Sequence, residues 1–232
     1  MVTNRSLSMF WLLALSGCAS QPAAETYKPS IDPANFQSQV DNPWHPLVPG
    51  TTYRYVERKD GVTSDGVVSV TSERKTILGV SCVVVHDQLT RQAKVLEDTY
   101  DWYAQDRSGN VWYMGEDTKA YDDKGHMSTE GSWEAGVKGA QPGIMMMANP
   151  TPGPAYRQEY LRGEAEDMGQ VIATNEAVTV PFGQFTSSLQ TKEWSLLEAG
   201  SDRKWYARGI GFVRSQAEDG EITELVGMSR VP

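Results

Sequence analysis

The sequence predicts an all-β fold, an antiparallel sandwich or incomplete barrel built from two pseudo-repeated halves. Apolar and polar residues alternate with a period of two, as Leu96, Tyr100, Trp102 and Ala104 do with the residues between them. No segment carries a long apolar stripe at helical spacing. Turn sequences divide the chain into short hairpins, at Asp60-Gly61, Asp65-Gly66, Ser108-Gly109-Asn110, Asp123-Lys124-Gly125 and Asp219-Gly220.

Residues 1–17 have the pattern of a secretory signal peptide. Arg5 precedes an apolar run, residues 9–15, that is too short to span a bilayer. The run ends in Leu15-Ser16-Gly17-Cys18, which matches the bacterial lipobox, the motif in which the cysteine is lipidated and becomes the new N-terminus. We therefore expect a lipoprotein held in a membrane by acyl chains on Cys18. The alternative is an ordinary signal peptide with an incidental thiol at Cys18.

Residues 18–40 are predicted to form the lipidated N-terminus and a flexible tether, because they are small, polar and proline-bearing. The remainder, residues 41–232, is long enough for one core and is predicted to be a single β-rich domain. Its halves are expected at about 41–148 and 149–232.

A weak internal repeat with an offset of about 103 positions predicts these halves. The segment 49–54 (PGTTYR) is echoed by 152–157 (PGPAYR), and 76–79 by 179–183. The groups Trp102-Tyr103-Ala104 and 109–111 return as Trp205-Tyr206-Ala207 and 211–213. Each half alone is too small to bury its apolar face well, so the two are expected to pack together.

The chain resembles a group of exported bacterial lipoproteins without an assigned activity. The resemblance covers most of residues 40–232 and lies in segments 98–106 (DTYDWYAQD), 109–116 (GNVWYMGE) and 205–213 (WYARGIGFV). It implies a β-rich envelope domain and supplies no catalytic residue.

The charge of the chain limits its partners. The formal net charge is −9, and removal of residues 1–17, which contain Arg5 and no acid, would make it −10. Nucleic acid is not expected as a partner, because phosphate binding depends on cationic side chains. We expect a membrane, contacted through the acyl chains, and an unknown ligand or envelope protein. Ala19 offers no aspartate retention signal, so the outer membrane, facing the periplasm, is expected in a two-membrane envelope.

Catalytic motifs are absent from the sequence. There is no Gly-x-Ser-x-Gly elbow, no His-Glu-x-x-His and no phosphate-binding glycine-rich loop, and His45, His86 and His126 show no metal spacing. Cys82 lies in an apolar run and is expected to be a buried free thiol. We therefore expect a non-enzymatic binding or assembly module without a cofactor. The alternatives are an envelope hydrolase that uses acidic residues and a divalent-cation-binding protein.

Two sets of residues are candidates for binding. Segment 97–123 holds eight acids and two bases, so Asp106, Glu116 and Asp117 are candidate calcium ligands, with a solvated hairpin face as the alternative. Trp102 and Trp205 are expected at equivalent inward positions, where they anchor the core or line a ligand groove, with Tyr103 and Tyr206 pointing the other way.

Overall fold

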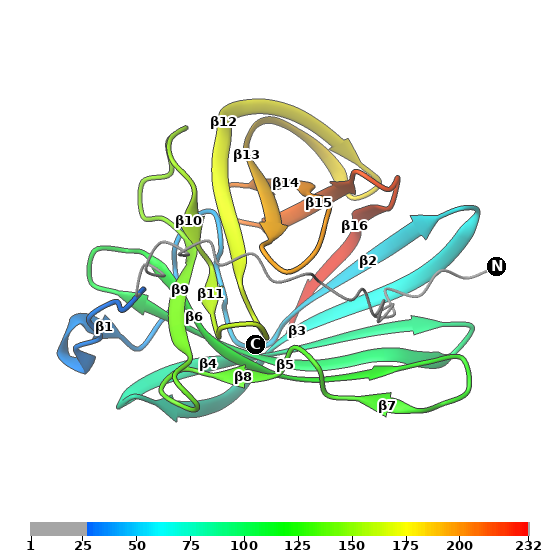
Figure 1. The fold of residues 1–232 in the computed structure, drawn as a ribbon. Helices are drawn as coiled ribbons and strands as arrows, with labels where there is room; N and C mark the ends of the chain where they lie inside the picture. The colour runs from blue at the N-terminus through cyan, green and yellow to red at the C-terminus, as the bar shows by residue number, and fades with distance from the viewer. Residues whose placement is uncertain (1–26, 232) are drawn as a thin grey trace, which may run out of the picture.

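The computed structural model describes residues 27–231, and the regular secondary structure in this part of the chain is almost entirely antiparallel strand (Figure 1). A single 3-10 helix, η1 (Pro33–Asn35), precedes the strands. The strands are β1 (Phe36–Gln37), β2 (Thr51–Lys59), β3 (Val62–Ile77), β4 (Val80–Arg91), β5 (Lys94–Asp106), β6 (Val111–Tyr121), β7 (Met127–Ser128), β8 (Trp133–Glu134), β9 (Gln141–Met146), β10 (Tyr156–Arg157), β11 (Glu159–Tyr160), β12 (Asp167–Val180), β13 (Gly183–Ser195), β14 (Asp202–Ala207), β15 (Gly211–Ala217) and β16 (Ile222–Arg230).

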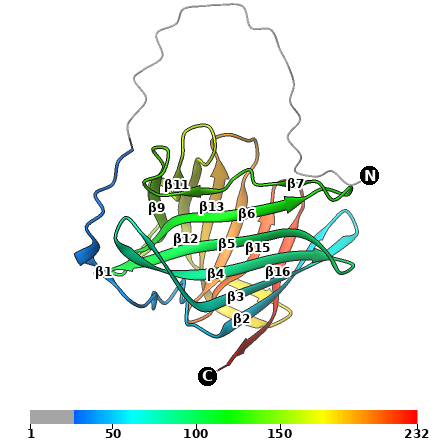
Figure 2. The same cartoon turned by 90° about the horizontal axis from the view of Figure 1, so that it is seen from below.

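The strands form one sheet that curls back on itself. Their order is β10-β12-β13-β14-β15-β16-β2-β3-β4-β5-β6-β9-β11, with β1 paired to β5 and both β7 and β8 paired to β6. Strands β10 and β11 follow one another in the chain but pair with opposite ends of this order, so they bring the two ends together. The result is a nearly closed barrel, in which the strands of the second half lie across those of the first (Figures 1 and 2). The prediction of an all-β incomplete barrel is confirmed.

The repeated sequence groups occupy matching places in the two halves. Hairpin β3–β4 turns at Leu78-Gly79, and hairpin β12–β13 turns at the corresponding position, between Val180 and Gly183. The pairing of β5 with β6 shifts register between Trp102 and Tyr103, and the pairing of β14 with β15 shifts between Trp205 and Tyr206. Both halves therefore carry a β-bulge at the same three-residue group.

Most of the predicted turns are present, and one is wrong. Asp60 and Gly61 connect β2 to β3 with φ angles of 50° and 78°, as a two-residue hairpin turn requires. Asp65 and Gly66 instead lie inside β3, where Asp65 is the register partner of Val56 on β2 and of Thr90 on β4. Because strands on both sides continue past this point, the chain runs straight through it.

Residues 27–40 belong to the packed domain and not to a tether. The Tyr27 hydroxyl donates a hydrogen bond to the carbonyl oxygen of Pro142 (3.0 Å), β1 pairs with β5, and Val40 is buried. The predicted signal peptide and Cys18 lie outside the described residues. Within residues 27–231, no helix has the length and apolar character needed to cross a membrane.

Both faces of the curved sheet contribute buried apolar side chains. Ile77, Met114, Leu189 and Leu225 are among the largest that are fully buried. Cys82 is 0% exposed and free, and burial raises the pKa of its thiol to about 12. The prediction of a buried, unreactive thiol is therefore confirmed.

Candidate functional site

Five acidic side chains on strands of both halves are buried or half-buried, and we call them the interior acid cluster. They are Asp87 (β4), Asp101 (β5), Glu116 (β6), Glu159 (β11) and Glu193 (β13). Tyr103 lies near four of these acids. Burial raises the pKa of its hydroxyl well above the usual range, and the next causes are the charges of Asp101, Glu116, Asp87 and Glu159. The His45 ring packs edge-on against Tyr103, with 5.3 Å between ring centroids, and it also experiences the charge of Glu193.

Asp101 and Glu116 form a cross-strand pair at the centre of the cluster. They are direct register partners on β5 and β6, an arrangement that holds Cβ atoms about 4.5–5.5 Å apart. The Tyr113 hydroxyl donates to Asp101 Oδ1 (2.6 Å), and the Thr118 hydroxyl donates to Glu116 Oε2 (2.6 Å). Burial, followed by the charge of Glu116, raises the pKa of Asp101 well above its usual range, and burial raises the pKa of Glu116 to about 7.

Glu159 is the most strongly shifted carboxyl for which a value is resolved. It is 6% exposed, and burial, together with the charges of Asp167 and Glu116, raises its pKa to about 9. Burial and the charge of Glu97 likewise raise the pKa of Asp87 to about 7. At neutral pH, Glu159 is therefore protonated and able to donate a hydrogen bond, while Asp87 and Glu116 are near their midpoints.

Glu193 stays ionised because it has a cation beside it. Burial alone raises its pKa, but the Lys204 ammonium at 2.8 Å and hydrogen bonds from the hydroxyls of Thr191 (2.7 Å) and Tyr206 (2.9 Å) lower it overall. Burial lowers the pKa of His45 to about 4, so its ring is neutral. His45 Nε2 is buried without a hydrogen-bond partner among the described residues.

The interior therefore presents donors and acceptors side by side. Protonated carboxyls and tyrosine hydroxyls donate, while the Glu193 carboxylate and the neutral His45 nitrogen accept. A polar molecule without a negative charge fits such a surface, because the ionised carboxylates of the cluster would repel an anion. The same mixture of protonated and ionised carboxyls is what general acid–base catalysis uses.

Trp102 and Trp205 occupy equivalent register positions in the two halves. Trp102 is buried in the hydrophobic core, and Trp205 is half-buried and packs against that core. Tyr103 and Tyr206, on the opposite faces of the same strands, are buried as well. The Lys75 ammonium lies 3.3 Å from the Trp102 ring centroid, and the Arg214 guanidinium lies 5.5 Å from that of Trp205. In the strand order, β15, β16, β2, β3 and β4 lie between the strands that carry the two rings.

The structure does not bring the three candidate calcium ligands together. Asp106 sits at the end of β5, where it accepts hydrogen bonds from the Asn110 backbone N–H (2.9 Å), Asn110 Nδ2 (2.8 Å) and Trp112 Nε1 (3.0 Å). Glu116 and Asp117 are neighbours on β6 and project to opposite faces. Among residues 27–231, no three His, Cys, Asp or Glu side chains are grouped closely enough to hold a metal ion.

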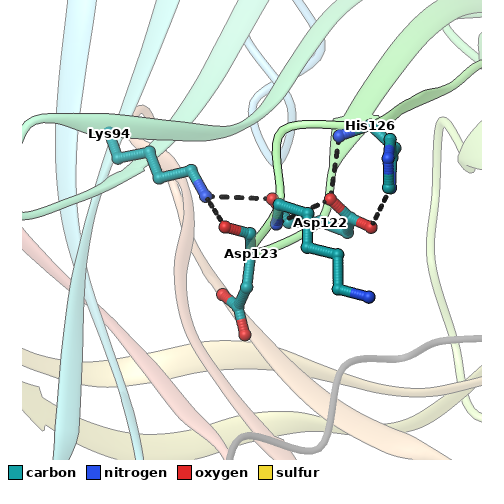
Figure 3. Close-up of polar contacts among 5 residues, drawn as sticks. Lys94, Asp122, Asp123 and His126 are labelled. Carbon is teal, nitrogen blue, oxygen red and sulfur yellow. Dashed lines mark hydrogen bonds and ion pairs between the residues drawn. The ribbon is translucent and has the colours of Figure 1, made fainter.

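Other acids of segment 97–123 organise an exposed turn (Figure 3). Asp122 Oδ1 accepts the backbone N–H groups of Lys124 and His126 at 2.8 Å each, and Asp122 Oδ2 lies 2.8 Å from His126 Nδ1. Lys94 Nζ donates to the carbonyl oxygens of Asp122 and Asp123, at 2.9 Å each. The carboxylate of Asp122 therefore fixes the turn between β6 and β7.

Sequence reasoning missed Asp87, Glu159, Glu193 and Lys204. Their signal is weak, since each is a charged residue in a strand-like segment without a recognisable motif around it. Asp101 offered the better clue, because it lies two residues before Tyr103 and so shares its face. Assigning that face to the interior requires knowing what packs against it.

No protein-family model matches the sequence, and no curated protein matches it. Among solved structures, the chain is similar to a Bacteroides fragilis protein described as exported and as having a YmcC-like fold. The identity is 17% and the TM-score 0.47, over 81% of this chain and 99% of that one. It is also similar to a Parabacteroides distasonis protein described as a lipoprotein, with 14% identity and a TM-score of 0.43, over 83% of this chain and 100% of that one. Similarity at this level carries no argument about the function of this chain.

Proposed function

We propose that the protein is a lipid-anchored, non-enzymatic binding module of the bacterial cell envelope, which takes a polar, non-anionic ligand into its barrel. The observation that carries the proposal is the interior acid cluster, where a polar interior replaces the apolar centre that a purely structural barrel needs. Burying several carboxyls costs stability, and carboxyls with strongly shifted pKa values are found preferentially at functional sites. The lipobox at Cys18 supports the anchor, and the absence of an aspartate at position 19 supports the outer membrane, with the domain facing the periplasm.

The tether in this proposal is short. Eight residues, 19–26, separate the acylated Cys18 from Tyr27, the first described residue, which packs on the domain. An extended chain spans at most about 3.3–3.6 Å per residue, so the domain stays within about 30 Å of the membrane. Tyr27 packs beside Tyr160 of β11, with 6.0 Å between ring centroids, so the seam of the barrel is the part tied nearest the anchor.

The first prediction concerns the anchor. Cys18→Ser should leave unprocessed precursor that incorporates no labelled palmitate, because serine offers no thiol for acylation. Cys82→Ser is the matched control and should label normally, since Cys82 is buried in the domain. Palmitate incorporation into the Cys18→Ser protein would show that the lipobox assignment is wrong.

The second prediction concerns the ligand. Full-length lipoprotein extracted from its own membrane into a maltoside detergent should carry a small polar molecule, detectable by native mass spectrometry. The double variant Asp101→Asn/Glu116→Gln should carry much less of it, because it loses the central pair of carboxyls. Glu164→Gln, on an exposed residue, serves as the control and should retain the molecule. Wild-type protein that is free of any bound molecule, or bound only to another protein, would contradict the proposal.

An envelope hydrolase is the second candidate, and one observation favours it. Glu159 is protonated and Glu193 ionised at neutral pH, so the interior holds a potential acid and a potential base. In the same mass spectrometry experiment, a hydrolase would convert the bound molecule on standing. The variant Glu159→Gln would then keep it intact, whereas a binding module would hold it unchanged in both proteins.

A further inference from the structure

A hollow lies where hairpin β12–β13 approaches the loop after β14. Its volume is about 500 Å³, and its lining includes Trp44, Asn175, Phe185, Ser187 and Arg208. No acidic residue lines it, although the chain contains 30 acids. It shares no residue with the interior acid cluster, so its chemistry must be considered separately.

Arg208, an exposed residue, provides a positive charge at this hollow. Its guanidinium carbon lies 5.0 Å from the ring centroid of the buried Trp44. The backbone on both sides is anchored, because Gly209 N–H donates to the carbonyl oxygen of Pro43 (2.6 Å) and Trp44 N–H donates to Asn42 Oδ1 (2.8 Å). Within residues 27–231, no carboxylate lies within ion-pair distance of the Arg208 guanidinium. Although the chain is acidic, the guanidinium of Arg208 makes a cation–π contact with Trp44 and no ion pair among the described residues.

Asn175 adds neutral hydrogen-bond donors on the opposite wall. The Ser187 hydroxyl donates to Asn175 Oδ1 (2.9 Å), which occupies the amide oxygen and leaves the two N–H groups of Nδ2 for another acceptor. Hydroxyl groups of Thr174 and Thr186 also line the hollow. The guanidinium, the amide N–H groups and the hydroxyls can all donate hydrogen bonds. An oxyanion is bound by hydrogen-bond donors of this kind together with a positive charge.

We infer that this hollow is an oxyanion-binding site, which takes the phosphate or carboxylate group of a small polar molecule through Arg208 and Asn175. The volume lies within the range of small-molecule sites and exceeds what one inorganic anion fills, so the ligand extends beyond its charged group. Phe185 offers that remainder an apolar wall. This site goes beyond the proposed function, because its residues and its preferred charge both differ from those of the barrel interior.

Isothermal titration calorimetry on the full-length protein in maltoside micelles tests the inference with three matched probes. Glucose 6-phosphate and glucuronate carry an oxyanion, and glucose does not. Binding of at least one charged probe and not of glucose is expected. Arg208→Ala should weaken that binding about tenfold or more, the size expected for losing a charge-assisted hydrogen bond. Arg208→Lys should bind with intermediate affinity, because lysine keeps the charge and loses the planar fork.

Arg162→Ala is the matched control, since Arg162 is an exposed arginine in the turn between β11 and β12 and is remote in sequence from the hollow. It removes the same charge and should bind as the wild type does. Asn175→Ala provides an independent test from the other wall and should also weaken binding. Vesicles of phosphatidylglycerol, compared with phosphatidylcholine, distinguish the sources of the anion: preference for the former, lost in Arg208→Ala, assigns it to a lipid headgroup. The inference is overturned if no charged probe or vesicle binds, or if Arg208→Ala and Arg162→Ala bind alike.

Discussion

The protein is expected to lose stability as the pH rises from 5 to 8, and Glu159→Gln is expected to remove a large part of that loss. The ordinary pKa of this carboxyl is 4.5, and in the folded protein burial raises it to about 9. Between these values the folded state holds a proton that the unfolded state has released. Stability therefore falls as pH rises through this window, by about 1.4 kcal/mol per pH unit, or about 4 kcal/mol over three units.

Outside this window Glu159 contributes no pH dependence. Below pH 4.5 both states are protonated, and above about pH 9 both are ionised. Asp87 and Glu116, whose pKa values are raised to about 7, add to the loss of stability only up to that pH. The effect of Glu159 is therefore most cleanly seen between pH 7 and 8.

Urea unfolding of wild type and Glu159→Gln at each pH measures this effect. The variant should match the wild type near pH 5, where glutamine replaces a protonated acid of similar shape, and should be the more stable protein at pH 8. Glu164→Gln removes an exposed carboxyl and should follow the wild-type curve. Parallel curves for wild type and Glu159→Gln would show that Glu159 is ionised at neutral pH in the folded protein.

Replacing Trp102 with alanine is expected to lower the free energy of unfolding by about 3–5 kcal/mol, the usual cost of truncating a buried tryptophan. Trp102 is 7% exposed, and its ring also contacts the Lys75 ammonium. Trp205→Ala is the matched comparison, because it occupies the equivalent place in the other half but is only half-buried, and it should cost clearly less.

Acrylamide quenching of single-tryptophan variants checks the same difference without changing the side chain. Fluorescence from Trp102 should be protected, and fluorescence from Trp205 should be quenched more readily. Equal quenching at the two positions, or equal loss of stability in the two alanine variants, would contradict the burial described here.

The sequence by itself determined the architecture. Two-residue alternation and turn dipeptides are local properties, since they depend on the geometry of a strand and of a tight turn, and they predicted the all-β fold and most of its hairpins. The repeated Trp-Tyr-Ala group predicted two related halves, and the strand paired with each copy carries a β-bulge at the same point. The predicted turn at Asp65-Gly66 was wrong, because a turn dipeptide alone does not show that the neighbouring strands continue past it on both sides.

The tertiary structure alone decided which face of each strand is inside. On β5 the face with Trp102 was predicted to point inward, and Trp102 does belong to the hydrophobic core. Tyr103, on the opposite face, is buried as well and lies near Asp101 and the other acids. Strand alternation assigns residues to two faces. It identifies the buried face only where one face is apolar and the other is polar. Here acids from strands far apart in the sequence lie close enough to raise one another's pKa. Those that stay protonated avoid the free-energy cost of burying a charge. That proximity comes from the closure of the sheet by β10 and β11, which joins residues that no local pattern connects.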